Sequence, residues 1–209
     1  MSRIESGTPA DESAPARVVA SRLVHRGRIW DLASDDVDLG HGPVVVRDYV
    51  RHPGAVAVIA LDDTERVLLV RQYRHPVRSL LWEPPAGLLD LDGENLRDAA
   101  ERELAEEADL RAQEWAVLAD YYTTPGSSDE AIRIFLARGI SEVPESERHE
   151  RQEEERDMAT TWIPLDEAVA AVLSGRMHNP SAVVGILAAA QARAQGWAPL
   201  RDVDAPWVR

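Results

Sequence analysis

Carboxylates at helical spacing are the residues of this chain best placed to do chemistry. Glu106 and Glu107 lie three and four residues after Glu103, so one face of a helix would carry all three. Such a cluster repels itself unless a cation neutralises it. Hard divalent cations accept oxygen ligands, and Mg²⁺ bridges readily from carboxylates to substrate phosphates. On spacing alone, a solvated acidic helix face explains the same residues and is the usual role of such a run.

The composition of the chain excludes several other chemistries. The 209 residues include no cysteine, and all 23 basic residues are arginines. Disulfides, thiolate metal sites and a cysteine nucleophile are therefore excluded, as are lysine Schiff bases and phosphate loops that end in Gly-Lys. A phosphate ligand would need arginines or a divalent cation as its source of positive charge.

The charge balance and the hydropathy pattern limit the partners and the location. The formal net charge is −14, and such an acidic surface repels polyanions, so we expect no nucleic-acid partner. The chain has no run of eighteen apolar residues and no apolar signal core near its start, so we expect neither a membrane span nor secretion. The absence of cysteine is typical of a reducing compartment, which favours a cytoplasmic location.

Periodicity predicts the elements that must position the carboxylates. Residues 94–110 are predicted to form a helix with a broad apolar face, within which Arg102 could hold Glu106. Residues 54–63 and 66–74 are apolar runs typical of buried central strands, and we expect them to pair as a hairpin. Further strands are predicted at residues 114–124, 131–140 and 160–165.

Two helices are predicted to close the chain. The first covers residues 166–175, with Asp166 as its N-cap and Gly175 just past its end. The second covers residues 181–194 and is expected to begin at Ser181 as N-cap. Strands on both sides of one central helix, with helices at the end, predict the α+β class: an α/β/α sandwich with a mixed central sheet, plus N-terminal antiparallel strands.

Three regions are expected along the chain. Residues 1–15 contain Pro, Ser, Ala and acidic residues without periodicity, which predicts a disordered tail. Residues 16–50 form a β-strand region of short alternating strands, broken at Gly27, Gly40 and Gly42. Residues 51–209 form the main domain.

The residues around the predicted helix resemble a known signature. The segment from Gly87 to Glu94, followed by Arg102–Leu110 with the sequence Arg-Glu-Leu-Ala-Glu-Glu-Ala-Asp-Leu, resembles the box of the Nudix hydrolase superfamily. Six residues instead of five separate Gly87 from Glu94, and Asp109 stands where the family has glycine. That position favours a left-handed backbone, which Asp tolerates better than most residues.

Segments outside the box resemble one branch of this superfamily, the ADP-ribose pyrophosphatases. They are GRIWDL, VRQYRHP, WEPPAG and TTPGSSDE, and Pro125 lies fifteen residues beyond Leu110 as that branch requires. The resemblance implies hydrolysis of ADP-ribose to AMP and ribose 5-phosphate. Two alternatives stay open: a pyrophosphatase for another nucleotide sugar of the GDP-mannose type, and a non-catalytic protein that senses ADP-ribose.

The resemblance also implies a metal site and a general base. Glu103 and Glu107 would be metal ligands, Glu106 a ligand or an orienting neighbour with a catalytic part, and the main-chain carbonyl of Ala86 a further ligand. The metal would be Mg²⁺, with Mn²⁺ possible. A loop glutamate would activate water, and Glu155 is favoured over Glu154 and Glu153, although a solvated charged loop explains these three equally well.

Substrate-binding roles follow from the same resemblance. Arg74 is the first candidate for a phosphate clamp and Arg71 the second, against the alternative of surface arginines. Glu83 would support the metal or bind a ribose hydroxyl, and Glu130 would contact the terminal ribose, unless it serves only turn chemistry.

The N-terminal region carries two further candidates. Trp30 would stack on adenine, with core burial as the alternative, and Arg51 would reach substrate across a subunit boundary. Relatives are homodimers in which N-terminal strands complete the partner's site, and residues 16–50 are short of apolar mass. We therefore expect a homodimer in which these strands exchange or dock.

Overall fold

The computed structural model describes residues 8–91, 93–149 and 158–207. They divide into two compact units, an N-terminal unit, Met1–Arg51, and a C-terminal unit, His52–Arg209. Each unit is considered by itself.

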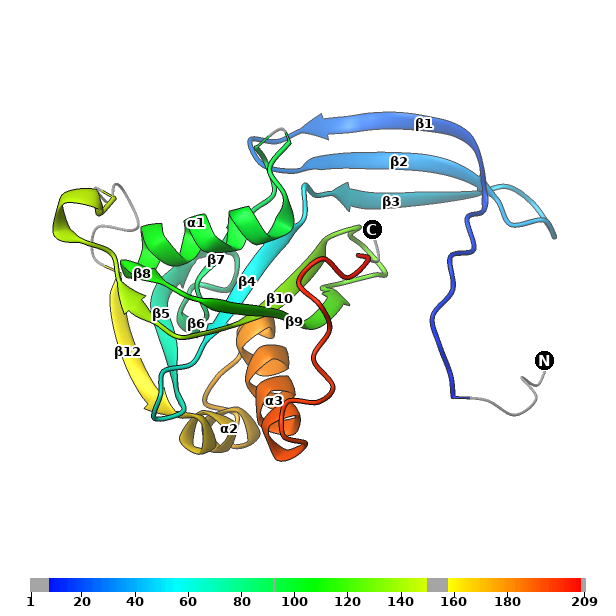
Figure 1. Ribbon diagram of the computed structural model, residues 1–209. Helices are drawn as coiled ribbons and strands as arrows, with labels where there is room; N and C mark the ends of the chain where they lie inside the picture. The colour runs from blue at the N-terminus through cyan, green and yellow to red at the C-terminus, as the bar shows by residue number, and fades with distance from the viewer. Residues whose placement is uncertain (1–7, 92, 150–157, 208–209) are drawn as a thin grey trace. The chain divides into compact units, whose positions relative to one another are not determined.

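The N-terminal unit is one antiparallel sheet of three strands. Its strands are β1 (Arg17–Arg26), β2 (Asp31–Asp38) and β3 (Val45–Arg51), in the order β1-β2-β3 (Figure 1). The strands predicted here are present, and the glycines predicted to break them lie in the connections between them. Burial is confined to the middle of β2, while apolar side chains of β1 and β3 are exposed. The unit therefore has no core of its own within the described residues.

The C-terminal unit is built from two larger sheets and three helices. One sheet has the order β7-β4-β10-β9, and the other has the order β12-β5-β6. The strands and helices are β4 (Ala55–Ala60), β5 (Arg66–Arg74), β6 (Ser79–Glu83), β7 (Ala86–Leu88), α1 (Leu96–Ala108), β8 (Leu110–Arg111), β9 (Glu114–Tyr122), β10 (Ala131–Arg138), β11 (Ser141–Glu142), β12 (Ala159–Pro164), α2 (Leu165–Leu173) and α3 (Pro180–Ala194). Short 3₁₀ turns cover His75–Val77 and Glu145–Glu147.

Helices cover both faces of the mixed sheet (Figure 1). On one face, Leu104 of α1 packs with Val58 and Phe135. On the other face, Ile59 packs with residues of α2 and α3. A Cβ at Gly185 of α3 would lie 2.7 Å from the Ile59 side chain, so this helix approaches β4 closely because residue 185 is glycine. The layered α+β architecture predicted from the sequence is confirmed.

The predicted hairpin between residues 54–63 and 66–74 is wrong. The chain does turn there, and the Asp62 N–H donates to the carbonyl of Arg66 at 3.1 Å. Beyond one bridge between Leu61 and Val67, however, the two strands enter different sheets. β4 pairs in parallel with β10, and β5 pairs with β12 and β6. In this arrangement helices cover both faces of the apolar run of β4, which a two-stranded hairpin would leave exposed.

Two predicted helix caps are also wrong, each by a small displacement. Helix α2 begins after Pro164, so Asp166 lies inside its first turn. Helix α3 is capped by Asn179, whose Oδ1 accepts from the Ala182 N–H at 2.9 Å, and Ser181 lies inside the helix. The proline at position 180 explains the shift, because proline is favoured at the first helical position, directly after the N-cap. Gly175 follows the end of α2 at a φ of 70°, as predicted.

A buried arginine fixes the C-terminal segment onto the sheet. Arg133 of β10 is 1 % exposed and forms two hydrogen bonds with Asp120 of β9, of 2.8 and 2.9 Å. Its remaining donors reach the carbonyls of Ala205 and Pro206. The segment before these residues bridges to β9 through Val117 and Arg201.

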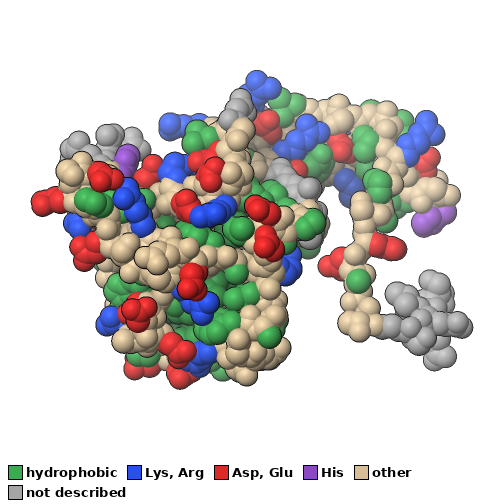
Figure 2. All heavy atoms as spheres, viewed as in Figure 1, with side chains coloured by type: hydrophobic (Ala, Val, Ile, Leu, Met, Phe, Trp, Pro, Cys, Tyr) green, Lys and Arg blue, Asp and Glu red, His purple; other side chains and the backbone are tan. Residues whose placement is uncertain are grey.

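Two further features concern the charged side chains on the surface and the length and apolarity of the helices. On the face shown in Figure 2, acidic and arginine side chains are interspersed over the C-terminal unit. No helix among the described residues is both long and apolar enough to cross a membrane.

Candidate active site

The predicted carboxylates lie on α1, which is positioned by strong signals at both ends. Asn95 caps the helix by accepting from the Asp98 N–H at 2.9 Å. The helix ends at Asp109, whose φ of 55° and ψ of 36° are left-handed. Asp therefore occupies the conformation that the family signature reserves for glycine, as the sequence predicted.

Glu107 and Glu103 contact the short strand β7. The Glu107 side chain accepts a hydrogen bond of 3.0 Å from the backbone N–H of Ala86, and the residue is 6 % exposed. Glu103 lies directly over Gly87, where an added Cβ would be 1.9 Å from the carboxyl carbon of Glu103. Glycine at position 87 is therefore required for the helix carboxylates to lie this close to the strand backbone.

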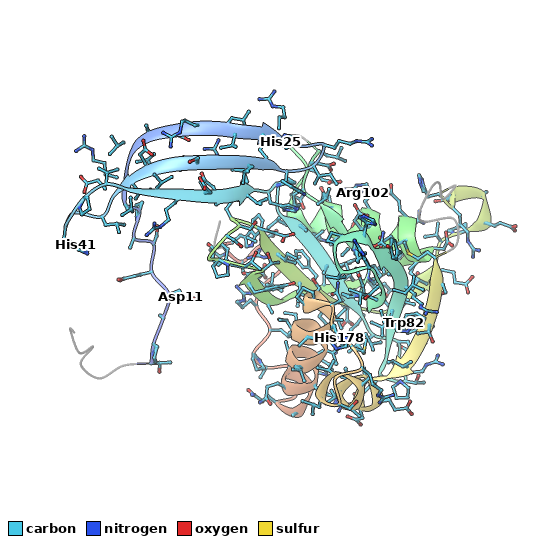
Figure 3. The ribbon with its side chains drawn as sticks, turned by 180° about the vertical axis from the view of Figure 1, so that it is seen from behind. Asp11, His25, His41, Trp82, Arg102 and His178 are labelled. Carbon is cyan, nitrogen blue, oxygen red and sulfur yellow. The ribbon has the colours of Figure 1, made fainter. Side chains whose placement is uncertain are left out.

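Arg102 of α1, labelled in Figure 3, links three carboxylates with one guanidinium group. Its Nε and Nη2 bind Glu94 at 2.9 and 3.0 Å, and its Nη1 lies 2.5 Å from Glu103 and 3.2 Å from Glu106. The sequence had suggested Glu106 alone as its partner. The hydrogen bond with Glu94 is the main cause that raises the pKa of Arg102 and lowers the pKa of Glu94. Both groups therefore stay charged throughout the neutral range.

The donor set of this cluster suits a hard divalent cation. Arg102 supplies one positive charge against the four carboxylates of residues 94, 103, 106 and 107. Within the described ranges, no three His, Cys, Asp or Glu side chains converge as a ready-made metal-binding group. The buried Glu107 and the close approach of Glu103 to β7 nevertheless offer oxygen ligands of the kind that Mg²⁺ and Mn²⁺ prefer.

Arg74 and Glu83 form a second charged pair. Arg74 Nε and Nη2 contact the Glu83 carboxylate at 3.0 and 2.6 Å, and Glu83 is 2 % exposed. Arg71 instead lies over the ring of Trp82, with its guanidinium carbon 5.7 Å from the ring centroid. Because strand side chains alternate between faces, Arg71 and Arg74 point to opposite sides of β5 and do not form one clamp.

Glu130 lies in a polar cluster that the sequence did not reveal. Its carboxylate accepts a 2.6 Å hydrogen bond from Thr123 Oγ1 and lies 3.5 Å from His52 Nε2. Nearby, the hydroxyls of Tyr121 and Ser181 are 2.8 Å apart. Burial, with the charges of Glu130 and Glu83, raises the pKa of Tyr121 to about 12. No motif marks His52 or Tyr121, because their partners are distant in the sequence.

Four of the predicted site residues lie either in the N-terminal unit or outside the described residues. Trp30 and Arg51 belong to the N-terminal unit, where Trp30 is 46 % exposed and Arg51 binds Ser21 Oγ at 2.8 Å. Trp30 is therefore not buried in a core of that unit. Glu154 and Glu155, together with their competitor Glu153, lie outside the described residues.

Comparisons with known proteins cover most of the chain. A family model described as the NUDIX domain matches residues 51–183. An ADP-ribose pyrophosphatase of Mycobacterium tuberculosis is 44% identical over 91% of this chain and 90% of its own length. A methanol dehydrogenase activator of Bacillus methanolicus is 34% identical over 81% of this chain and 90% of its own length. A crystal structure of an ADP compounds hydrolase shares the fold, with a TM-score of 0.66 at 21% identity over 90% of this chain and 99% of that one.

Proposed function

This chain belongs to the Nudix family, and from that premise we propose that it hydrolyses the pyrophosphate of ADP-ribose to AMP and ribose 5-phosphate. The proposal rests chiefly on its 44% identity, over nine-tenths of both chains, to an ADP-ribose pyrophosphatase. The arrangement of Glu103 and Glu107 against the backbone of β7 supports it, because a diphosphate repels a nucleophile until positive charge is brought close.

Nudix hydrolases are generally dependent on a divalent metal ion. We propose Mg²⁺, with Mn²⁺ as a possible substitute, bound by Glu103, Glu107 and Glu106 and by the main-chain carbonyl of Ala86. Such an ion, when bound, screens the diphosphate and stabilises the charge that develops on its oxygens during hydrolysis. Arg102 restricts the rotamers of the carboxylates that it contacts, so the ligands are held in place before the ion binds.

The remaining roles concern water and substrate. We propose Glu155 as the base that orients water, with Glu154 and Glu153 as alternatives and Glu106 as a second catalytic carboxylate. In the substrate-binding set, Arg74 would contact phosphate from its place beside Glu83, and Glu130 would accept ribose hydroxyls. The ion pair with Glu83 supports a positioned Arg74, because it holds the guanidinium in one orientation. Arg71 is the weaker phosphate candidate, since it contacts Trp82.

The same proposal includes a homodimer. The exposed apolar residues of β1 and β3 support an N-terminal sheet that is covered by a second copy, in which Trp30 and Arg51 contact substrate. We expect light scattering of the purified protein to give twice the chain mass of 23.1 kDa. We also propose the three regions 1–15, 16–50 and 51–209 as tail, exchange region and hydrolase domain, and the cytoplasm as the location. Subcellular fractionation tests the last point.

One experiment tests the activity directly. The protein is incubated with Mg²⁺ in ¹⁸O-labelled water and ADP-ribose, GDP-mannose, UDP-glucose or NADH, and the products are identified by mass spectrometry. We expect AMP and ribose 5-phosphate from ADP-ribose, one of them labelled, and the highest kcat/KM for this substrate. Turnover of another sugar nucleotide without AMP from ADP-ribose would overturn the substrate assignment. Binding of ADP-ribose without turnover of any substrate would favour a sensor.

A further inference from the structure

His52 connects two loops of the C-terminal unit. Its backbone N–H donates to Asp129 Oδ1 at 2.7 Å, which ties it to the loop between β9 and β10. Its ring Nε2 lies 3.5 Å from Glu130 Oε1 in the same loop. The His52 side chain is only 12% exposed, so contacts within the protein hold it in position.

A backbone hydrogen bond fixes the orientation of the His52 ring. The backbone N–H of Gly54 donates to His52 Nδ1 at 3.1 Å, so Nδ1 is the acceptor in this contact. The other ring nitrogen, Nε2, is thereby directed toward the Glu130 carboxylate, 3.5 Å away.

Each oxygen of Glu130 has a polar neighbour. Oε1 lies 3.5 Å from His52 Nε2, and Oε2 accepts from the Thr123 hydroxyl at 2.6 Å. A carboxyl oxygen has more than one lone pair, so the same oxygens can also accept hydroxyl donors of a ligand.

The same residues connect to the backbone beside the metal-binding carboxylates. Gly54 O accepts from the N–H of Leu89, at 3.1 Å, immediately after β7. Strand β7 contains Ala86 and Gly87, which contact Glu107 and Glu103. The pKa of Tyr121 responds to both Glu130 and Glu83, so Glu130 lies in the same electrostatic neighbourhood as the charged pair of the site.

We propose that His52 is a positioning residue that fixes Glu130 as an acceptor for a pair of sugar hydroxyls, and so sets the preference of the site for a ribose-bearing diphosphate. This inference rests on the proposed function, because the sugar is that of ADP-ribose. His52 itself does not contact the reacting atoms. It acts through the orientation of the Glu130 carboxylate.

Two variants of the same residue separate this role from a structural one. His52→Asn keeps an acceptor near the position of Nδ1 for the Gly54 N–H but is too short to donate to Glu130. His52→Gln places an amide donor near the position of Nε2 and so retains the contact with Glu130. A purely structural role predicts that Asn is tolerated at least as well as Gln. The positioning role predicts the reverse order.

The measurement is steady-state hydrolysis of ADP-ribose with product inhibition. For His52→Asn we expect KM to rise about tenfold with kcat within twofold of wild type, and His52→Gln to recover most of the loss. Ribose 5-phosphate should inhibit the wild type more strongly than 2-deoxyribose 5-phosphate, and His52→Asn should lose that difference. Inhibition by AMP should be unchanged. His41→Asn, at an exposed histidine between β2 and β3 (Figure 3), is the matched control.

The experiment distinguishes a failure of the positioning role from a failure of the proposed function. If the wild type does not hydrolyse ADP-ribose, the proposed function fails first. If the wild type is active and His52→Asn keeps a normal KM and a normal preference for ribose 5-phosphate, the positioning role is overturned. Thr123→Val removes the donor on the other oxygen and should give the same KM shift, so the test survives if His52 variants fold poorly. A normal KM in that variant would also count against the proposal.

Discussion

The sheet of residues 17–51 and the layers of residues 52–207 are built from similar strands but differ in what covers them. In the N-terminal unit, Val18, Val24 and Val46 are at least half exposed. In the C-terminal unit, every residue of β4 is buried between helices. A sheet needs a covered apolar face for independent stability. Within the described residues, the C-terminal unit covers its strands with its own helices, whereas the apolar positions of the N-terminal sheet stay exposed.

Two arginine–aspartate pairs, one in each unit, also differ in burial. Arg133 and Asp120 have side chains 2% and 4% exposed, whereas Arg22 and Asp36 have side chains 50% and 29% exposed. Both pairs form two hydrogen bonds between neighbouring antiparallel strands. The two pairs therefore have similar hydrogen bonds but different burial. Comparing them tests how strongly burial changes the contribution of an ion pair to the free energy of unfolding.

The largest expected effect is on catalysis, and it locates the chemistry in the C-terminal unit. If Glu107 holds the metal as proposed, Glu107→Gln should lower kcat by about 10³-fold, because the amide keeps an acceptor for the Ala86 N–H but loses the negative charge. Calorimetry should show weaker Mn²⁺ binding, and the thermal transition should stay near that of the wild type. Glu101→Gln, on the exposed side of α1, is the control and should be fully active. A Glu107→Gln enzyme within tenfold of wild type would remove Glu107 from the metal site.

The second effect is on stability and uses the matched pairs. Asp120→Asn should cost about 3 kcal/mol of unfolding free energy, because it leaves the Arg133 charge buried without its charged partner and also weakens the exposed contact with Arg201. Asp36→Asn should leave the urea midpoint almost unchanged, because its arginine is solvated and the pair is exposed. Equal shifts for the two variants would break the comparison between the units.

The third effect is on assembly and tests what covers the N-terminal sheet. The double change Leu23→Arg and Val24→Arg places charge on two exposed apolar positions of β1. We expect light scattering to show a smaller particle at the same concentration, with little change in the melting of the C-terminal unit. If the wild type is already a monomer, or the variant keeps the wild-type mass, a second copy does not cover this strand.

The smallest effect concerns the alkaline limit of the C-terminal unit. Burial raises the pKa of Tyr121 from 10.0 to about 12. A group whose pKa is higher when folded contributes stability below its unfolded pKa and loses it as pH rises, so the loss should fall between pH 10 and pH 12. Since the chain has no lysine, tyrosine ionisation dominates this range. Tyr121→Phe should flatten the decline of the urea midpoint between pH 9 and pH 12, and an unchanged decline would assign it to other groups.

Several features of the site could be predicted because they depend on neighbours in the sequence. The spacing of Glu103, Glu106 and Glu107 fixes their face on any helix, and the left-handed end at Asp109 follows from its place in the signature. The pairing of Arg102 with Glu106 follows from a separation of four residues. Its contacts with Glu94 and Glu103 were not predicted, because a long side chain chooses among several reachable partners.

Other features depend on partners that no local rule connects. The predicted hairpin of β4 and β5 failed because β4 lies between β7 and β10, and β10 comes more than seventy residues later in the chain. Arg74 was predicted to bind phosphate, and only the fold shows that its guanidinium forms an ion pair with the buried Glu83. His52 and Glu130 meet for the same reason, across the sheet that places β4 and β10 side by side.

The sequence by itself determined the family, through the signature at residues 87–110, and also the layered class and the helix that carries the carboxylates. The class and the helix follow from periodicities of a few residues, which bias the backbone locally. The tertiary structure alone decided the close fit of Glu103 over Gly87, the burial of Arg133 and the orientation of the His52 ring. Each of these arises from contacts between segments far apart in the chain, and their energies depend on burial, which a linear pattern does not specify.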